Sequence, residues 1–227
     1  MGLNRDFTFR GHTYKVACVE DFAQHPSWFS HEDESIVRDR TWAIGTGDVV
    51  FDVGAAYGSY SLTALACGAA FVYAWSPPES SPQEPGLFEE SLILNGWLNR
   101  CEIMTTGVYD RTGWLETYYQ TFTTEAPADM KSSVIHVQTL DDWRKEREIM
   151  AAPRYWMKLD VEGAEVEVFK GAEKLIAEFR PTISVENHLF KRATLGQEVR
   201  GLLESWGYTH HETVPYHSVS HSLYLPR

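Results

Sequence analysis

The sequence predicts an α/β fold with a mostly parallel sheet and helices on both faces. Apolar segments of strand length alternate along the chain with segments whose apolar residues recur at helical spacing, which is typical of strand–helix–strand units. A glycine-rich turn containing Gly54 and Gly58 directly follows one apolar strand and precedes a helical segment. Such a turn lets an α/β protein bring its backbone close to a ligand at the start of a helix.

Length and charge limit the range of functions. The 227 residues are enough for one α/β domain and few for two. The net charge of −12 disfavours binding to nucleic acid or to an acidic membrane surface, because both need basic patches. The three cysteines form no C-x-x-C pair, so neither a disulfide framework nor a zinc site is expected. Since neither a signal sequence nor an apolar run of transmembrane length is visible, we expect a cytoplasmic location.

The first part of the chain predicts an extension that leads into the core. Residues 7–19 alternate well enough for a strand or hairpin, and a helix is expected over Glu32–Trp42. We therefore divide the chain into an N-terminal strand and helix extension, residues 1–45, which packs on a core domain, residues 46–227.

The core begins with two strands joined by a helix. A strand over residues 48–53 is followed by a helix over Ser59–Ala66 and a second strand over Ala70–Trp75. Four prolines between Ser76 and Gly86 predict a segment without regular structure, because proline lacks the amide donor and disfavours helix. An amphipathic helix is expected next, and its apolar face comprises Leu87, Phe88, Leu92, Leu94 and Leu98.

The second half of the core continues the alternation. A helix is expected over Val168–Phe179, whose apolar residues fall at helical offsets, and Pro181 ends it. The chain closes with a helix over Leu195–Trp206 and a hairpin of Tyr208–Val214 against Ser218–Leu225, which fits an antiparallel sheet edge. The other strands are expected at Cys101–Thr105, Leu115–Tyr119, Ser133–Val137, Tyr155–Leu159 and Thr182–Glu186.

The glycine-rich turn gives the first indication of chemistry. Asp52, Gly54 and Gly58 form the spacing D-x-G-x-x-x-G at the end of an apolar strand. This spacing differs from the G-x-G-x-x-G of dinucleotide-binding folds, so a nicotinamide-dependent oxidoreductase is disfavoured. It is the spacing expected where S-adenosylmethionine (SAM) is bound. A tight turn with no ligand remains the simpler alternative.

Acidic residues also follow two later strands. Asp160 and Glu162 come after the apolar strand that ends at Leu159, and they point to the same side if the strand extends through both. Glu186 and His188 lie at the end of the next strand. Since ligands bind at the carboxyl ends of parallel strands, three such ends with acids predict a site along one sheet edge.

The three strand ends together carry a resemblance. The segments FDVGAAYGSYSL, MKLDVEGAEVEVFKGAEKL and PTISVENH resemble the FkbM family of SAM-dependent methyltransferases, whose most specific signature is K-x-D-x-E-G-x-E. The match runs from about Glu34 to the C-terminal hairpin. The resemblance implies a Rossmann-like class I methyltransferase fold, with a seven-stranded sheet whose last strand is antiparallel. It also implies SAM as cofactor and a small-molecule hydroxyl acceptor, such as a sugar or natural product.

The same resemblance implies roles for individual residues. Catalysis is expected from Asp160, Glu162 and His188. The expected cofactor-binding residues are Asp52, Gly54, Ala55, Tyr57, Gly58, Ser59, Ser76 and Asp160.

Two positions depart from the family pattern. Ala56 stands where the family usually has Asn, and Ser76 stands where it has the acid that accepts hydrogen bonds from both ribose hydroxyls. Since a neutral hydroxyl replaces a charged bidentate acceptor, we expect cofactor binding weaker by about 1–2 kcal/mol. Glu79 or Glu84 in the proline-rich segment could replace the missing acid.

Each candidate residue also has a simpler interpretation. Asp160 could cap the following helix, Glu162 could be a solvated acid, and Glu186 and His188 could satisfy each other. Four histidines near the C-terminus lack metal-ligand spacing and are expected on a solvated edge. They are His210, His211, His217 and His221.

Methyl transfer to a hydroxyl requires a base or a metal ion, because a hydroxyl is a poor nucleophile until it loses its proton. Asp160, Glu162 and His188 are the candidates for the base. Asp160 with Glu186 could instead hold a divalent cation, although the sequence offers no clear third ligand. The main alternative is a protein of methyltransferase fold that has lost catalysis and binds or scaffolds, and Ser76 favours it. The acceptor, metal dependence and oligomeric state are left open.

Overall fold

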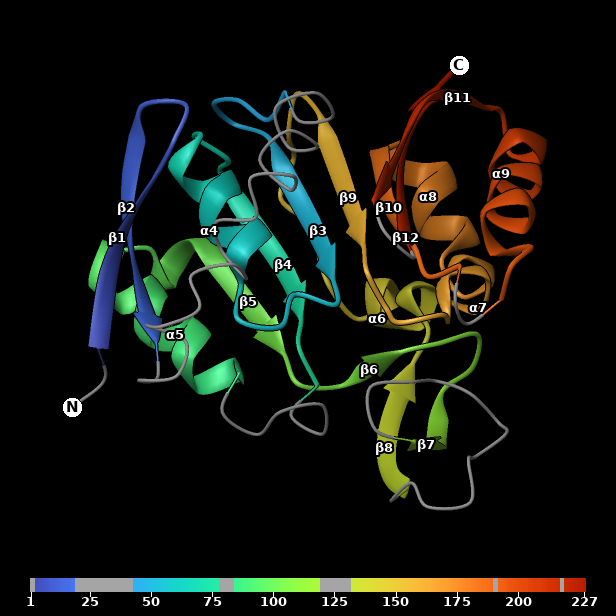
Figure 1. Ribbon diagram of the computed structural model, residues 1–227, viewed down its shortest axis with the longest axis horizontal. Coiled ribbons are helices and arrows are strands. Elements are labelled where there is room, and N and C mark those ends of the chain that lie inside the picture. The colour runs from blue at the N-terminus through green and yellow to red at the C-terminus, as the bar shows by residue number, and fades with distance from the viewer. Residues whose placement is uncertain (1–2, 19–42, 78–83, 119–131, 190–191, 217–218) are drawn as a thin grey trace.

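The computed structural model describes residues 3–18, 43–77, 84–118, 132–189, 192–216 and 219–227. Its main sheet has seven strands in the order β11-β12-β10-β9-β3-β4-β5 (Figure 1). Five of them are parallel, β12 is antiparallel to both of its neighbours, and β11 forms the outer edge. This arrangement confirms the predicted Rossmann-like sheet with an antiparallel closing hairpin. The strands are β3 (Val49–Val53), β4 (Phe71–Trp75), β5 (Cys101–Met104), β9 (Tyr155–Leu159), β10 (Thr182–Asn187), β11 (Tyr208–Tyr216) and β12 (Val219–Pro226).

Helices cover both faces of this sheet, as predicted (Figure 1). Of the helices that the structure describes, none is long and apolar enough to cross a membrane. The helices are α4 (Ser59–Ala66), α5 (Glu84–Asn95), η1 (Leu98–Arg100), α6 (Leu140–Lys145), α7 (Glu165–Lys170), α8 (Glu173–Phe179) and α9 (Leu195–Ser205).

The alternation of side chains along β3 separates two apolar cores. Val49, Phe51 and Val53 point to the face covered by α6 to α9, where Phe51 packs edge-on against Trp143. Val50 points to the other face and joins a second core with residues of α4 and α5. Asp52 shares the side of Val50, so its carboxyl group is directed toward α4.

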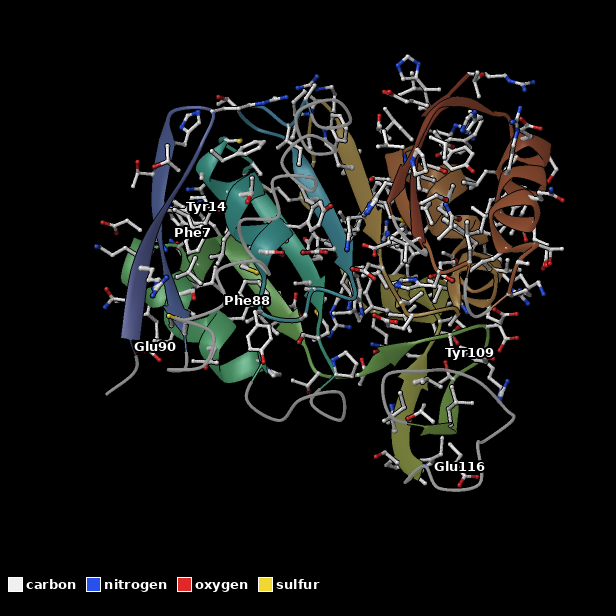
Figure 2. All side chains as sticks on the ribbon, viewed as in Figure 1. Phe7, Tyr14, Phe88, Glu90, Tyr109 and Glu116 are labelled. Atoms are coloured by element: carbon white, nitrogen blue, oxygen red, sulfur yellow. The ribbon has the colours of Figure 1, made fainter. Side chains whose placement is uncertain are left out.

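An N-terminal hairpin, β1 (Leu3–Phe9) and β2 (His12–Cys18), packs on α4 and α5, at the left of Figure 1. The Asn95 side chain accepts from the backbone N–H of Lys15 at 2.8 Å and donates to its carbonyl at 2.7 Å. Figure 2 shows Tyr14 facing the helices, where its hydroxyl lies 2.8 Å from Thr63 Oγ1. The predicted helix over Glu32–Trp42 lies outside the described residues, and the division into an extension and a core domain stays a prediction.

A second, three-stranded sheet is a feature that the sequence did not predict. Its strands β6 (Gly107–Val108), β7 (Gly113–Tyr118) and β8 (Ser132–Gln138) lie in the order β6-β8-β7, at the end of the main sheet where the parallel strands finish (Figure 1). The strands at 115–119 and 133–137 were expected, but they join this sheet and not the main one. Figure 2 labels Tyr109 next to it and Glu116 on β7.

Two helix predictions need correction. The segment Ser76–Gly86 is not irregular throughout, because α5 begins at Glu84 and takes Pro85 into its first turn, where a missing amide hydrogen costs no bond. The single helix over Val168–Phe179 is two helices, α7 and α8, that separate at Gly171. A Cβ atom on Gly171 would lie 2.2 Å from the carbonyl oxygen of Tyr109, so a tertiary contact accompanies the break.

The amino ends of the central strands are tied together by Asp48, which is fully buried. Its carboxylate accepts hydrogen bonds from the Gly45 backbone, from the Arg154 guanidinium and from the Trp156 indole, at distances between 2.9 and 3.1 Å. This network lies at the end of the sheet opposite the acidic strand ends.

At the carboxyl end, the turn after β3 touches the end of β9. Gly54 has a φ of 86°, and a Cβ atom there would lie 1.7 Å from the carbonyl oxygen of Asp160. The backbone N–H groups of Gly54 and Ala55 donate to the Trp75 carbonyl, and that of Asp160 donates to Val53. Three strand ends therefore meet at one glycine.

We predict that Gly54→Ala destabilises the fold by more than about 3 kcal/mol, because it adds a backbone clash to the cost of a left-handed conformation. The matched control is Gly11→Ala, since Gly11 has a φ of 80° but a Cβ atom there would meet no other atom within 4 Å. It should cost about 1 kcal/mol. Urea unfolding of both variants measures the difference, and equal losses would contradict the role of the Asp160 contact.

Candidate active site

The loop between β3 and α4 is shaped by three left-handed residues, Gly54, Ala56 and Gly58. A Cβ atom on Gly58 would lie 2.2 Å from the Phe88 ring, so packing requires glycine there. Ala56 adopts a φ of 48°, a conformation that Asn tolerates better than Ala does. This is a physical reason for the Asn that the family usually has at this position.

The other predicted loop residues take different places. Ala55 is buried, Tyr57 is half-buried against the core around α4, and Ser59 is the first residue of α4. The N-cap of α4, Gly58, supplies no side-chain hydrogen bond to the helix, and the first turn carries no acidic residue. The positive end of this helix therefore has no negative side chain of its own.

Asp52 lies fully buried beneath the loop. Its Oδ2 accepts a 2.6 Å hydrogen bond from the Ser61 hydroxyl, whereas its Oδ1 has no hydrogen-bond partner among the described residues. Burial raises the pKa of Asp52, and the nearby charge of Lys158 opposes that shift. Because a buried acceptor normally has a donor, Oδ1 is an unsatisfied acceptor within the described part of the chain.

Ser76 is buried and used by the loop itself. Its hydroxyl donates to the carbonyl of Ala56 at 3.0 Å, and its backbone N–H donates to Met104. Of the two acids considered as replacements, Glu79 lies outside the described residues and Glu84 is the first residue of α5. The structure thus gives Ser76 a bond that fixes the loop.

Lys158, on β9, is a site residue that the sequence analysis did not single out. Its buried ammonium donates to Asp160 Oδ2 at 2.6 Å and lies 4.3 Å from the centre of the Tyr60 ring. Burial alone would lower the pKa of Lys158, but the negative charge of Asp160 and further acids outweighs it and holds the pKa above its usual value. The K-x-D spacing could have revealed this pair, because it places both side chains on one side if the strand extends to Asp160.

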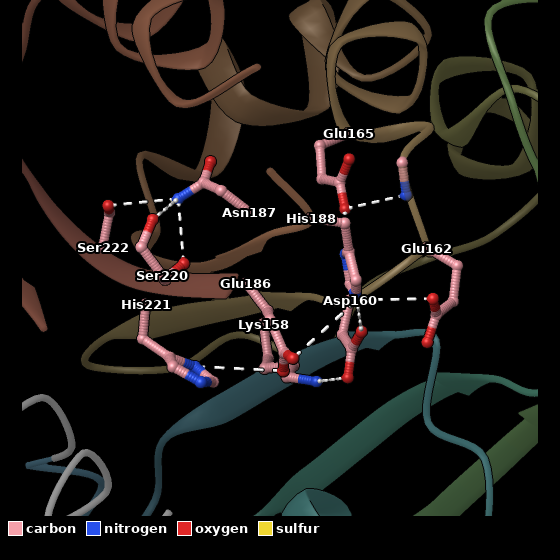
Figure 3. Close-up of polar contacts among 11 residues, drawn as sticks. Lys158, Asp160, Glu162, Glu165, Glu186, Asn187, His188, Ser220, His221 and Ser222 are labelled. Carbon is pink, nitrogen blue, oxygen red and sulfur yellow. Dashed lines mark hydrogen bonds and ion pairs between the residues drawn. The ribbon is translucent and has the colours of Figure 1, made fainter. Parts of the chain in front are cut away.

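His188 lies at the centre of a carboxylate cluster (Figure 3). Its Nδ1 is 2.7 Å from Glu165 Oε1. Its Nε2 faces three more carboxylates, those of Glu162 at 3.5 Å, Asp160 at 3.6 Å and Glu186 at 3.8 Å. Burial alone would lower the pKa of His188, but the contacts with Glu162 and Glu165 and the charge of Asp160 raise it to about 11. His188 is therefore a cation at neutral pH in this arrangement.

Asp160 and Glu162 both face Nε2 of the His188 ring, although β9 ends at Leu159 and does not extend through them. Burial would raise the pKa of Asp160, but the charges of Lys158 and His188 keep it below its usual value. Glu162 has a φ of 55°, a strained conformation for a side chain of this kind, and is 44% exposed. The interpretation of Asp160 as a helix cap is wrong, because Ala164 is the N-cap of α7 and makes no side-chain cap bond.

His221 corrects the prediction of a solvated histidine edge. In the register of β12 against β10 it lies opposite Glu186, and its buried ring places Nδ1 3.9 Å from Glu186 Oε2 (Figure 3). His211 is exposed and His210 partly exposed, with its Nε2 2.7 Å from Thr213 Oγ1. His217 lies outside the described residues.

Asp160, Glu186 and His188 offer ligand atoms within 4.8 Å of one another, which is the geometry of a possible cation site. The Lys158 ammonium already occupies one oxygen of Asp160, and His188 would have to lose a proton before Nε2 could bind a metal ion. Two cations, Lys158 and His188, thus lie among four acids and offset part of their negative charge; the acids are Asp160, Glu162, Glu165 and Glu186. The reaction proposed below is assigned to these side chains.

Comparison with solved structures supports the fold. A methyltransferase FkbM from Methylobacillus flagellatus matches with a TM-score of 0.56 at 20% identity, over 79% of this chain and 43% of its own. The chain thus spans less than half the length of that protein. A conserved hypothetical protein from Streptococcus pyogenes (TM-score 0.51, 10% identity) and a proposed rRNA methylase from Clostridium thermocellum (0.51, 8%) are each covered over 94% of their length, by 85% and 86% of this chain. At such identities the likeness shows the fold alone.

Sequence comparison identifies the family. A search of curated proteins found no match. The profile of the methyltransferase FkbM domain matches residues 52–209, which include the glycine loop and all the acidic strand ends described above. Because this match spans well over half of the chain, the chain belongs to the FkbM methyltransferase family.

Proposed function

We propose that this protein is a SAM-dependent O-methyltransferase that acts on a hydroxyl group of a small molecule, such as a sugar or a natural product. One observation carries the proposal: an unpartnered buried carboxylate oxygen and an uncapped helix end lie beside a cluster of acids whose most exposed member is Glu162. Methyl transfer is the reaction expected from the family, and these residues would bind the cofactor and a hydroxyl group.

The residues of the loop suit the amino-acid end of SAM. That end carries an ammonium group, which matches Asp52 Oδ1, and a carboxylate, which matches the N-terminus of α4. Gly54 and Gly58 keep the backbone close and free of side chains at this point. When bound, the cofactor supplies an electrophilic methyl group on a sulfonium.

For the acceptor, we assign the base to Glu162. It is the most exposed acid of the cluster. Asp160, by contrast, already accepts a hydrogen bond from the ammonium of Lys158. Glu162 would take the proton of the acceptor hydroxyl, so that its oxygen becomes a nucleophile for the methyl group that bound SAM would supply. Asp160 and the imidazolium of His188 would hold the hydroxyl in place beside Glu162. His188 itself, being protonated, is a weaker choice of base than the carboxylates.

The Ser76 hydroxyl favours one alternative, a protein of the same fold that binds the cofactor and does not turn it over. One measurement distinguishes the two functions. Incubation with SAM labelled in its methyl group and a panel of hydroxylated small molecules should yield labelled product. Tight binding of SAM with no product across the panel would support the alternative.

The cofactor assignment predicts that Asp52→Asn weakens SAM binding about 10- to 100-fold, because it removes the charge that faces the ammonium. Isothermal titration calorimetry measures this, with Asp110→Asn as a surface control that should leave affinity unchanged. Absence of SAM binding by the unmodified protein would overturn the proposal.

Ser76 gives a second prediction. Ser76→Ala should weaken SAM binding about 5-fold through the lost loop bond, whereas Ser76→Glu should strengthen it about 5- to 30-fold by restoring an acceptor for the ribose. The same calorimetric titration compares the three proteins. If the Glu variant binds no better than the Ala variant, residue 76 is not beside the ribose.

The charge of His188 predicts a pH dependence of stability. Its folded pKa of about 11 lies above the ordinary value of 6.5, so the stabilisation is complete below about pH 6.5 and declines as pH rises toward 11. The destabilisation caused by His188→Gln should therefore be larger at pH 6 than at pH 9. Urea unfolding of both proteins at the two pH values tests this, and a constant difference would mean that His188 is neutral.

A further inference from the structure

Glu165 is a buried acid to which neither the sequence analysis nor the proposed mechanism gives a role. It begins α7, and its side chain is fully buried. Ionised carboxylates are rarely found inside a protein unless they are paired, because desolvation of the charge is costly. The partners of Glu165 therefore indicate why an acid is found at this buried position.

Both partners belong to the candidate active site. Oε1 of Glu165 lies 2.7 Å from Nδ1 of His188 and accepts the backbone N–H of Gly163 at 3.1 Å. Oε2 has no hydrogen-bond partner among the described residues. One oxygen thus holds the imidazole ring and also the loop that carries Glu162.

The contact with Glu165 fixes the direction of the ring. It is the shortest of the four contacts between His188 and carboxylates, the others being 3.5 to 3.8 Å on Nε2. Figure 3 shows Glu165 on one side of the ring and Asp160 on the opposite side. With Nδ1 held by Glu165, Nε2 must face the other acids.

The loop also depends on this carboxylate. Glu162 and Gly163 both have positive φ values, 55° and 106°, so the loop turns through two left-handed residues in succession. A strained non-glycine residue persists only where its surroundings over-determine it. The hydrogen bond from Gly163 to Glu165 lies next to that strained residue and holds it in place.

We propose that Glu165 is the positioning residue of this active site, and that it acts by orienting the His188 ring and the Glu162 loop toward the acceptor hydroxyl. Its side chain is fully buried, so it acts through His188 and Gly163. The inference rests on the proposed function for its effect on turnover, and on geometry alone for its effect on the ring.

The other charged groups around the ring lie on its Nε2 side. Lys158 on β9 contacts Asp160, and His221 on β12 faces Glu186 on β10. Glu165 is the acid on the Nδ1 side among the described residues. A change at Glu165 should therefore be detected first at Nδ1.

The test compares Glu165→Gln with Glu167→Gln. Glu167 lies two residues on along α7 and faces Arg192 at 3.6 Å, not His188, so it is a matched control. In proteins with ¹⁵N-labelled histidine rings, the unmodified chain and the control should show a protonated, hydrogen-bonded Nδ1 for His188. The Glu165→Gln variant should shift that signal.

The kinetic test compares the effect of the substitution on kcat with its effect on KM. Since misplacement by about 1 Å costs on the order of 100-fold, Glu165→Gln should lower kcat about 10- to 100-fold, with KM for the acceptor changed less than about 3-fold. The Glu167→Gln control should retain both constants. Equal loss in both variants would indicate a structural effect of α7 and would overturn the inference.

The ring spectra decide the inference even if no acceptor is turned over. An Nδ1 signal that is the same in Glu165→Gln and in the unmodified chain would overturn it, while leaving SAM binding and methyl transfer intact. If Glu165→Gln does not fold, the unmodified chain still provides the test. A His188 whose Nδ1 carries no proton in that chain would contradict the hydrogen bond donated to Glu165 and would overturn the inference.

Discussion

The candidate site depends on one close backbone approach, that of Gly54 to the carbonyl of Asp160. Chain segments about a hundred residues apart meet there with no room for a methyl group. The approach places the loop between β3 and α4 directly beside the loop between β9 and α7. Everything else at the site, the buried Asp52 below and the acid cluster alongside, takes its position from this junction. The strict need for glycine at residue 54 is therefore structural, whatever the ligand.

Electrostatics are organised around the same junction. Two buried cations, Lys158 and His188, lie among acids whose exposed parts face outward. Burying either cation alone would be costly, and placing the acids side by side without them would cause mutual repulsion. The pairing lets several carboxylates stay ionised within a small space. In the proposed reaction, an acceptor hydroxyl would meet hydrogen-bond acceptors that are already fixed, so little reorganisation would be needed.

The sequence predicted those parts of the fold that depend on local pattern. The helix Ser59–Ala66 and the strand Tyr155–Leu159 have the predicted bounds, because each has a clear period and a distinct end. Parts that depend on tertiary contact were missed. The break at Gly171 arises where the chain packs on Tyr109, and the second sheet joins short strands whose pairing no local pattern reveals.

The same distinction applies to the site. Asp160, Glu162 and His188 were expected near one another because they follow strands that share an edge, and the structure brings them together. His221 was missed because only the register between β10 and β12 places it opposite Glu186.

The presence of Ser76 instead of an acid has a consequence for the proposed cofactor site. If residue 76 lies beside the ribose, as proposed, weaker binding there affects the cofactor and its demethylated product equally, because the ribose is identical in both. In the proposed reaction such uniform binding changes the cofactor concentration at which the enzyme is half-saturated and leaves the methyl-transfer barrier in the filled enzyme unchanged. Ser76 would then adapt the enzyme to the supply of its methyl donor.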